Sequence, residues 1–566
     1  MKRCTVILAL LVVFTSGCGE IKSRVFKSGK DVTAASAMVV TAHPVASLAG
    51  ARILAGGGNA VDAAVATEFA LAVCFPAAGN IGGGGFMVVR LKDGTVNSID
   101  YREMAPSSAT EDMYLDEKGN PVDSLSLFSH LSSGIPGTVD GLIRVHEKYG
   151  KKKFRDVIQP AIDLANKGFK ITAEQARSFN YMRERFLMQN DHNVAFVKDI
   201  PWKEGDLLIQ PELGATLERI RDRGRDGFYS GETAQMIVAE SQRGNGLITL
   251  EDLKNYTSKW RDPVITSYRG YKVISMAPPS SGGIILAQLL RMTELTDTIP
   301  GGFHDPSEIH LMVEEERRAF ADRAQFLGDP DFNKIPKEAL INDKYLSGRI
   351  ADYNPLKATP SDSVTSGNPA IYESEETTHY SIVDQYGNAV AGTTTLNNSY
   401  GSAIVVKGAG FILNDQMDDF SSKPGTPNLY GLVGGKANAI APGKRMLSSM
   451  TPTIVEKDKK LYMVLGTPGG STIITSVFQV IRNVIDYKMT AAQAVAAPRF
   501  HHQWLPDIIR YEENGIDSAT IKVLESMGHK LAPVGSIGSV EAILIDEEGN
   551  PNGAADPRGD DTAVGW

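Results

Sequence analysis

The run Glu373-Ser374-Glu375-Glu376-Thr377-Thr378-His379-Tyr380-Ser381-Ile382-Val383-Asp384 decides how this chain folds and works. A polar, acidic stretch ends at Glu376, and a strand-like stretch begins with the hydroxyl residue Thr377. Cutting the chain before Thr377 would give that residue a free α-amine, whose pKa of about 7.7–8.0 leaves much of it neutral near neutral pH. The amine could take the proton from its own hydroxyl, which makes Thr377 nucleophile and base in one residue. The alternative is a plain strand start, because threonine favours strands.

The residues after this junction predict a β-hairpin. Two strand-like runs, 378–384 and 389–396, are separated by four turn-forming residues. Without a slip in register, Thr378 faces Thr395, and a slip of one or two residues is compatible with the pattern. Thr395 and Asn397 would then lie beside the candidate nucleophile. Polar side chains at these positions also fit ordinary turn chemistry.

Further sequence blocks occur in a fixed order along the chain. Those after the junction are Thr395-Leu396-Asn397, Asn414-Asp415-Gln416-Met417-Asp418-Asp419-Phe420, Lys444-Arg445-Met446-Leu447-Ser448-Ser449-Met450 and Gly466-Thr467-Pro468-Gly469-Gly470-Ser471. Those before it are Gly57-Gly58-Asn59-Ala60-Val61-Asp62-Ala63-Ala64, Gly79-Asn80-Ile81-Gly82-Gly83-Gly84-Gly85-Phe86, Tyr101-Arg102-Glu103-Met104-Ala105-Pro106 and Pro278-Pro279-Ser280-Ser281-Gly282-Gly283. From Met38 to Trp566 the chain resembles a bacterial γ-glutamyltransferase, also called γ-glutamyltranspeptidase or glutathione hydrolase.

This resemblance implies an N-terminal-nucleophile hydrolase of the α/β class, with a four-layer αββα sandwich that spacing alone could not reveal. It implies self-cleavage between Glu376 and Thr377 into a large subunit, 19–376, and a small catalytic subunit, 377–566, which remain together as a heterodimer. The implied reaction passes the γ-glutamyl group of glutathione and related compounds to water, amino acids or dipeptides through a γ-glutamyl-Thr377 intermediate.

The resemblance also assigns an oxyanion hole to Gly469 and Gly470. Consecutive glycines let backbone N–H groups approach a tetrahedral oxyanion without obstruction by side chains. A tight turn after the preceding strand is the alternative for this pair. Thr395 is expected to orient Thr377, and Thr378 is a further candidate for that role.

A free amino-acid head group carries a carboxylate and an ammonium, and the chain offers partners for both. Arg102 suits the carboxylate because a guanidinium binds it in a bidentate way, and Ser448 and Ser449 would add hydroxyl donors. For the ammonium, the candidates are Asp419 as the charged partner with Asn397 and Gln416 as neutral acceptors. The alternatives are a surface salt bridge of Arg102 with Glu103 or Asp100, and a calcium-like pair of Asp418 and Asp419 that lacks the spacing of a calcium loop.

The segment from Phe420 to Leu447 is rich in glycine and proline, so neither a long helix nor a long strand is expected there. It resembles the lid loop of many bacterial members of the family, with Tyr430 as the aromatic residue that closes over the site. A lid favours small γ-glutamyl compounds such as glutathione over polymeric substrates.

The N-terminus has the composition of an export signal. Lys2 and Arg3 precede the apolar run 6–14, which is too short to span a bilayer as a mature helix. Residues 15–18 resemble a lipobox, with Thr15 at the usual leucine position, so a lipid on Cys18 is expected and ordinary signal-peptidase cleavage is the alternative. Residues 1–18 are therefore a signal peptide, and the protein is expected to be periplasmic or membrane-anchored.

Composition fits a large globular enzyme, with 566 residues, 42% hydrophobic and 22% charged. The net charge of −9, without a long basic run, argues against a nucleic-acid partner. No cofactor or metal is expected: Gly82–Gly85 lacks a nucleotide-binding pattern, and the adjacent His501 and His502 would point in different directions. Cys74 ends an apolar helix-like run and is expected in the core.

Helices are expected at 45–54, 60–73, 471–487 and 518–527, as a pair within 283–327, and over most of 138–255 with Pro160 and Pro211 as breakers; hairpins are expected at 86–101, 264–276, 452–466 and 541–556. Two other functions compete with the transferase. One is a related acylase for glutaryl-type β-lactam side chains, and the other is a non-catalytic solute-binding lipoprotein. The threonine at 377 and the complete set of head-group residues weigh against the acylase. The intact nucleophile and oxyanion block weigh against the lipoprotein.

Overall fold

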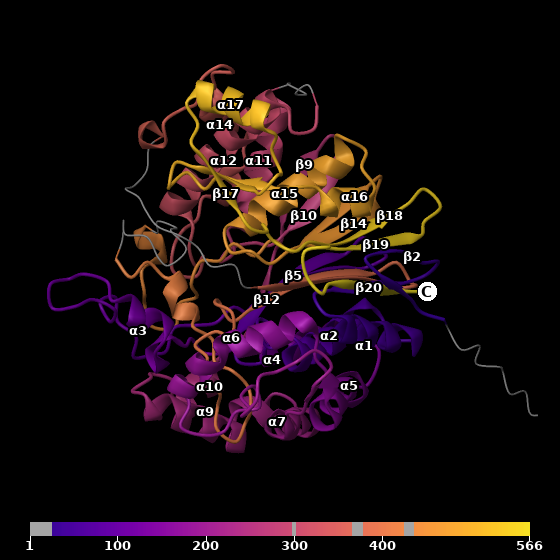
Figure 1. Cartoon of the computed structure of the whole chain (residues 1–566), viewed down its shortest axis with the longest axis vertical. Coiled ribbons are helices and arrows are strands. Elements are labelled where there is room, and N and C mark those ends of the chain that lie inside the picture. The colour runs from indigo at the N-terminus through magenta and orange to yellow at the C-terminus, as the bar shows by residue number, and fades with distance from the viewer. Residues whose placement is uncertain (1–24, 297–301, 365–376, 424–434) are drawn as a thin grey trace, which may run out of the picture.

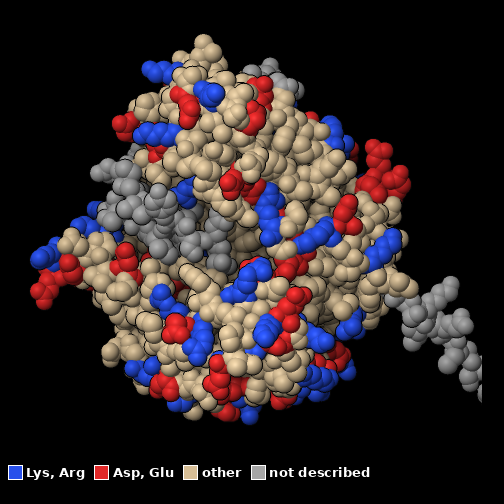
Figure 2. Space-filling model, in the orientation of Figure 1, with Lys and Arg blue, Asp and Glu red and all other residues tan. Residues whose placement is uncertain are grey.

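The structure, a computed structural model, describes residues 25–296, 302–364, 377–423 and 435–566. Two β-sheets lie face to face at the centre, and helices cover both outer faces (Figure 1). The α/β class and the four-layer αββα sandwich are therefore confirmed. Over the face shown in Figure 2, acidic and basic side chains are interspersed.

In the described residues the first sheet has eight strands, all paired antiparallel. Their spatial order is β1 (Lys27–Gly29), β20 (Thr562–Gly565), β3 (Met38–Thr41), β11 (Thr378–Val383), β12 (Ala389–Thr395), β4 (Gly84–Arg90), β5 (Val96–Asp100) and β8 (Lys259–Arg261). Strands from both sides of the 376/377 junction alternate here, because β20, β11 and β12 lie among strands from the first half of the chain.

The second sheet has seven described strands and is also antiparallel. Their spatial order is β2 (Asp31–Thr33), β19 (Pro551–Ala555), β18 (Glu541–Ile545), β14 (Lys460–Gly466), β13 (Thr453–Lys457), β10 (Tyr271–Ser275) and β9 (Val264–Tyr268). Apolar residues on the facing sides of both sheets, including Val40, Phe86, Ile274, Ile454 and Ile543, form the core between them. Since successive side chains of a strand alternate in direction, the other sides are free to pack against helices.

Two small sheets complete the strands: β15 (Phe500–His501) with β16 (Ile509–Glu512) and β17 (Leu531–Val534), and β6 (Phe169–Lys170) with β7 (Leu207–Leu208). Helices on the side of the first sheet are α1 (Pro44–Ala55), α2 (Ala60–Cys74), α3 (Asp123–Leu127), α4 (Thr138–Tyr149), α5 (Phe154–Lys167), α6 (Ala173–Gln189), α7 (Pro211–Arg223), α8 (Asp226–Tyr229), α9 (Gly231–Arg243) and α10 (Leu250–Asn255). On the side of the second sheet are α11 (Gly282–Leu295), α12 (Pro306–Phe326), α13 (Lys337–Leu340), α14 (Asp343–Ile350), α15 (Thr472–Ile485), α16 (Ala491–Ala496) and α17 (Ser518–Met527). Short 3-10 turns form at η1 (His130–Ser132), η2 (Ser361–Ser363), η3 (Gln416–Asp419) and η4 (Lys436–Asn438). Among the helices of the described ranges, none is both long and apolar enough to cross a bilayer.

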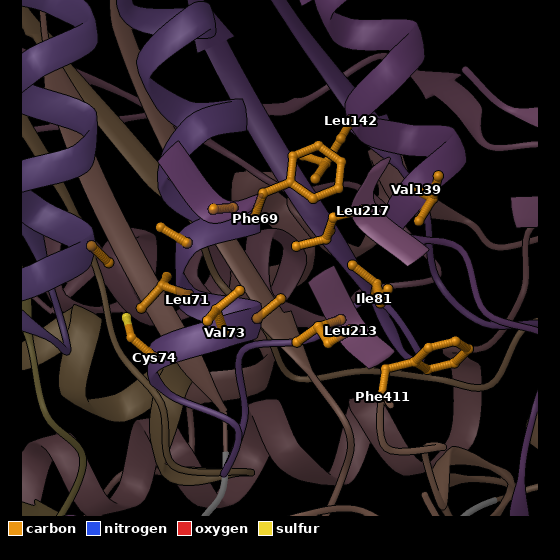
Figure 3. Close-up of a cluster of buried hydrophobic side chains, with 14 of the residues drawn as sticks. Phe69, Leu71, Val73, Cys74, Ile81, Val139, Leu142, Leu213, Leu217 and Phe411 are labelled. Carbon is orange, nitrogen blue, oxygen red and sulfur yellow. The ribbon is translucent and has the colours of Figure 1, made fainter. Parts of the chain in front are cut away.

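Helix α2 shows why this layer is stable. Asn59 caps its N-terminus in a capping box with Asp62, as expected for asparagine followed by an acidic first turn. Every residue of the helix is buried, and Figure 3 shows Phe69, Leu71 and Val73 among apolar side chains from neighbouring elements. Cys74 lies in this core, as predicted, and burial raises the pKa of its thiol far above its usual value.

The expected helices and hairpins form close to their predicted bounds, with one correction. Pro160 was predicted to break a helix, but it lies inside α5. An interior proline costs about 3 kcal/mol, and here the buried face of α5, including Val157, Ile158, Ala161 and Ile162, packs into the core and offsets that cost. Pro211 does mark a boundary, since it is the first residue of α7.

Candidate active site

Thr377 directly precedes β11, and the residue is 6% exposed. β11 pairs with β12 in a hairpin, as predicted, but the register differs by one residue from the unslipped expectation. Thr378 faces Thr394, so Thr395 follows at the level of Thr377. Thr395 therefore lies beside Thr377, as predicted. The register that places it there is the one shifted by one residue.

The turn explains this register. The Asp384 carboxylate accepts hydrogen bonds from the backbone N–H groups of Tyr386 and Asn388, both at 2.9 Å, and Asp384 N–H donates to the Asn388 carbonyl at 3.0 Å. Gly387 has φ +90°, which suits glycine. Asp384 thus pairs with Asn388, which leaves Val383 opposite Ala389.

His379, two residues after Thr377, is not placed as its base. Its ring nitrogens hydrogen-bond the hydroxyls of Thr393 at 2.8 Å and Ser381 at 3.1 Å. Burial lowers the pKa of His379 to about 3, so the ring is neutral at ordinary pH. This arrangement leaves the α-amine of a cleaved Thr377 as the local base.

Gly469 and Gly470 follow β14 and precede α15, with φ values of +131° and +53°. Gly469 and Thr377 line the same cavity. A Cβ on Gly469 would lie 2.4 Å from the Thr472 hydroxyl, so a side chain does not fit there. The pair also forms a turn, with Thr472 N–H donating to the Gly469 carbonyl at 2.9 Å. The turn alternative is therefore correct, and the same turn brings Gly469 to the cavity that Thr377 lines. The role of the two glycines as oxyanion donors stays a prediction.

Arg102, at the end of β5, is 1% exposed and forms an ion pair with Asp419 of η3. Gln416 Nε2 donates to the same Asp419 carboxylate at 2.7 Å. The two residues predicted to hold opposite charges of a head group thus neutralise each other directly. A bound amino-acid head group could separate them, because its carboxylate matches Arg102 and its ammonium matches Asp419.

The alternative explanations for these charges are not supported. Arg102 is buried, so a surface salt bridge is wrong, although its Nη1 does lie 3.5 Å from Glu103 Oε2. Burial raises the pKa of Glu103 to about 7, against the opposing effect of the guanidinium. The calcium-like pair is not formed either, because Asp418 accepts a hydrogen bond from the Ser126 hydroxyl at 2.6 Å while Asp419 faces Arg102.

The remaining predicted head-group residues gather at the same place. Arg102 Nη2 donates to the Leu447 carbonyl at 3.2 Å, which brings it to the chain just before Ser448 and Ser449. The Ser449 hydroxyl accepts a bond from Arg323 at 3.0 Å, a contact that the sequence analysis missed. Asn397, with φ +81°, receives its orientation from the Asp415 carbonyl, to which its side chain donates at 3.0 Å.

Three predicted residues, Cys18, Glu376 and Tyr430, lie outside the described residues. For the segment that resembles a lid, the described end is anchored at the site. Asn438 donates to the Asp419 carbonyl at 2.7 Å and accepts from Leu447 N–H at 2.9 Å.

A cavity of about 250 Å³ opens at Thr377. Its lining includes Ala42 after β3 and Asp561 before β20, with Ala77 and Tyr400. In the first sheet, β3 and β20 lie on one side of β11, whereas β12, β4 and β5 lie on the other. The cavity therefore extends to the β3 and β20 side of the nucleophile, whereas Arg102 follows β5 on the other side.

Histidines elsewhere have structural partners. His501 bonds Ser471, Thr475 and Gln503, and His502 bonds Asp507.

Within the described ranges, His310, Glu314 and His529 lie close enough to share an ion. His310 Nδ1 is hydrogen-bonded to His529 at 2.7 Å, its Nε2 to the Asn354 carbonyl at 2.8 Å, and the Glu314 carboxylate accepts from Arg318 at 2.6 Å. These bonds explain the cluster without a metal.

Comparisons with known proteins identify relatives that match almost the whole chain. The chain is 49% identical over 538 residues to the glutathione hydrolase proenzyme of Escherichia coli (strain K12), which covers 94% of this chain and 93% of that protein. It is 36% identical to the acylase ACY 1 proenzyme of Pseudomonas sp. (strain V22), with 94% of each chain covered.

Solved structures give the same result for the fold. A cephalosporin acylase from Bacillus halodurans has a TM-score of 0.84 at 25% identity, covering 98% of this chain and 99% of that one. A chain of Helicobacter pylori gamma-glutamyltranspeptidase has a TM-score of 0.57 at 45% identity, covering 60% of this chain and 97% of its own. The family model described as gamma-glutamyltranspeptidase matches residues 46–566. The chain that carries Thr377, its two glycines and the Arg102–Asp419 pair thus belongs to the gamma-glutamyltranspeptidase family.

Proposed function

We propose that this chain hydrolyses γ-glutamyl compounds such as glutathione and transfers their γ-glutamyl group to amino acids or dipeptides. The observation that carries the proposal is the ion pair of the buried Arg102 with the half-buried Asp419, which lies on one flank of Thr377. A free amino-acid head group offers a charge to each partner, so it can replace the direct pair with two charge-assisted contacts. The γ-carbonyl, separated from that head group by a short chain, would then reach Thr377.

The reaction follows from the placement of these groups. The Thr377 hydroxyl oxygen attacks the γ-carbonyl carbon, and its proton passes to the α-amine of the same residue. The N–H groups of Gly469 and Gly470 would stabilise the resulting oxyanion. The C–N bond of the donor then breaks, the leaving amine takes a proton, and a γ-glutamyl ester remains on Thr377. Water or an acceptor amine attacks that ester and restores the hydroxyl.

The same hydroxyl would generate the enzyme from its precursor. Thr377 attacks the carbonyl of Glu376, the acyl group moves from nitrogen to oxygen, and water hydrolyses the ester. The products are a large subunit, 19–376, and a small subunit, 377–566, whose first residue has the free amine. The name proenzyme in the relatives supports this two-subunit form.

The leaving group and the acceptor would occupy the cavity on the other flank. A donor whose head group lies at Arg102 extends past Thr377 toward β3 and β20, where the cavity opens. An acceptor must approach the ester from the side that the leaving group has vacated. Transfer therefore depends on this cavity, whereas hydrolysis needs only water there.

The related acylase is the second candidate, because a protein named as an acylase is 36% identical to this chain. A glutaryl group has no α-ammonium, so it would leave Asp419 and Gln416 without the charge that they match. The structure therefore favours the γ-glutamyl group as the transferred unit.

The deciding experiment compares two donors on the purified, processed protein: γ-glutamyl-p-nitroanilide and glutaryl-p-nitroanilide, with and without Gly-Gly. We expect the first to be preferred by roughly a hundredfold in kcat/KM, because the second leaves buried polar groups unpaired. A preference for the glutaryl donor would support the acylase instead. A protein that stays in one piece and cleaves neither donor would favour the solute-binding lipoprotein.

Export is a separate proposal that rests on residues 1–18 alone. A lipid on Cys18 would anchor the protein in a membrane, and a Cys18→Ala variant would then move to the soluble fraction. Incorporation of labelled palmitate into the parent protein and its loss in the variant would support lipidation. Equal solubility of both proteins without label would argue for ordinary signal-peptidase cleavage.

A further inference from the structure

The block Pro278-Pro279-Ser280-Ser281-Gly282-Gly283 contributes no side chain to the proposed reaction steps. It connects β10 to α11 and runs beside the Ser448 segment, to which it is joined by a parallel bridge between Ser280 and Ser448. Ser448 N–H donates to the Pro279 carbonyl at 3.0 Å, and the Ser280 hydroxyl donates to the Met450 carbonyl at 2.6 Å. The block is therefore the support on which the two candidate carboxylate-binding serines rest.

A buried arginine connects this support to one of those serines. Arg323, near the end of α12, is 4% exposed. Its Nε donates to the Ser281 hydroxyl at 2.9 Å, and its Nη2 donates to the Ser449 hydroxyl at 3.0 Å. One guanidinium thus spans two hydroxyls, one in the large-subunit region and one in the small-subunit region.

These bonds fix the direction in which each hydroxyl can donate. A serine hydroxyl has one proton to donate and can accept two bonds. Ser281 accepts from Arg323 and donates its own proton to the Ser448 carbonyl at 2.7 Å. Ser449 also accepts from Arg323, and within the described residues its hydroxyl proton has no recorded acceptor. Because the Ser449 oxygen already accepts from the Arg323 guanidinium, the Ser449 hydroxyl proton must point to an acceptor other than Arg323.

We propose that Arg323 is a positioning residue for the donor's α-carboxylate, acting through Ser449 and held in place by Ser281. By donating to Ser449, it forces that hydroxyl to present its proton to the carboxylate. Its positive charge would also lie one hydroxyl behind the carboxylate and would add to that of Arg102, which is itself paired with Asp419. This inference rests on the proposed γ-glutamyl function and deepens it by adding a second cation to carboxylate recognition.

The competing interpretation is purely structural, in which Arg323 only fastens α12 to the Ser448 segment. The two interpretations differ in which donors they affect. A positioning role concerns donors that carry an α-carboxylate, whereas a loss of packing lowers activity on every donor. Two donors separate these cases: γ-glutamyl-p-nitroanilide, and 4-aminobutyryl-p-nitroanilide, which keeps the amine but lacks the carboxylate.

The experiment uses the processed enzyme with Arg323→Lys, Ser281→Ala, Ser449→Ala and the double variant Arg323→Lys/Ser449→Ala. Lysine keeps the charge but cannot span both hydroxyls. We expect Arg323→Lys to raise KM for γ-glutamyl-p-nitroanilide by about tenfold with kcat within about twofold, as for the loss of one bond to a charged group. Its slow rate on the 4-aminobutyryl donor should not change. Ser281→Ala should act in the same direction with a smaller effect, and it tests the idea even if the Arg323 variant folds poorly.

The double variant provides the decisive result. If Arg323 acts through Ser449, adding Arg323→Lys to Ser449→Ala should change KM by less than about twofold, because the effects of coupled residues do not add. Arg318→Lys is the matched control, since Arg318 lies on the same helix and pairs with Glu314 and Asp352. Additive effects, or an equal loss on both donors, would overturn the proposal. Failure of the unmutated enzyme to cleave γ-glutamyl-p-nitroanilide would instead overturn the proposed function, and this inference with it.

Discussion

The two flanks of Thr377 differ in how firmly the protein fixes the side chains that would contact a ligand. On the Arg102 flank, Arg102, Ser448 and Ser449 are all buried and already hydrogen-bonded by the protein. On the opposite flank lies a cavity of about 250 Å³ whose lining mixes apolar residues, such as Ala77, with polar ones.

This difference predicts how the enzyme selects its substrates. The Arg102 flank holds its charges in fixed positions, so it should accept one kind of head group and reject analogues that leave a partner unpaired. The cavity flank offers volume and few fixed contacts, so it should accept leaving groups and acceptors of varied structure. Thr377 thus lies between a flank that is expected to be strict toward the donor and a flank that is expected to be tolerant toward the acceptor.

The largest effect should come from the residue between the flanks. Thr377→Ala removes the hydroxyl needed by both reactions, so the precursor should remain full length and kcat should fall by roughly 10⁴ or more. Mass spectrometry and donor hydrolysis measure the two outcomes. The matched control is Thr33→Ala, because Thr33 is an exposed threonine of strand β2 and belongs to none of the site residues. Cleavage between 376 and 377 in the Thr377→Ala protein, free of other proteases, would refute the assignment.

The next largest effect tests the donor flank. Arg102→Lys should raise KM for γ-glutamyl-p-nitroanilide by roughly ten- to a hundredfold, because a point charge loses the bidentate geometry. Asp419→Asn should weaken the same donor but should hardly affect a glutaryl donor, which has no ammonium. Self-cleavage should persist in both variants. Unchanged KM values for the γ-glutamyl donor would show that the head group lies elsewhere.

A smaller effect is expected on the cavity flank. Ala77→Leu would place extra carbon atoms in the cavity, so transfer to Gly-Gly should fall by roughly tenfold relative to hydrolysis, as for a steric change in a binding pocket. KM for the donor head group should stay nearly constant. Ala351→Leu, at an exposed position after α14, is the control. An unchanged ratio of transfer to hydrolysis would place the acceptor outside this cavity.

The smallest effect concerns stability and pH. Glu68 of α2 accepts hydrogen bonds from Tyr101, the residue before Arg102, and from Tyr380 of β11, so it ties the donor flank to the nucleophile strand. Burial raises the pKa of Glu68 to about 7. The folded state therefore keeps a proton that the unfolded state has lost, and stability falls as pH rises from about 4.5 through 7. Glu68→Gln removes this dependence. The gap in Tm between variant and parent should shift in favour of the variant from pH 5 to pH 8, and parallel Tm curves would contradict the prediction.

The sequence was most informative where contacts are local. The hairpin after Thr377 follows from an alternating pattern around a turn, and the family, the enzyme class and the fold class predicted from the motif blocks are confirmed. The register was left open because the carboxylate of Asp384 closes the turn on Asn388, a side-chain bond that strand patterns do not encode. Pro160 was misjudged because packing of α5 outweighs its local preference.

Long-range contacts were out of reach of the sequence. Arg102 and Asp419 are 317 positions apart, and their direct pairing depends on the complete fold. Arg323 was missed because nothing near it in sequence signals a bond to Ser449, although the Pro278–Gly283 block was recognised as part of the family pattern. The subunit boundaries, the leader and the individual roles of the site residues stay predictions.

The alternation of strands within the sheets affects whether the two pieces can separate and whether the cut protein can refold. β11 lies between β3 and β12, and β3 lies between β20 and β11. A cut before Thr377 therefore leaves two pieces whose strands alternate and are joined by backbone hydrogen bonds. Neither piece can diffuse away without dismantling both sheets, so dilution should not inactivate the enzyme. The strands of the two pieces pair while the chain is still continuous. Each piece alone lacks the neighbouring strands with which it must pair. Denaturation should therefore be reversible before the cut and a one-way event after it.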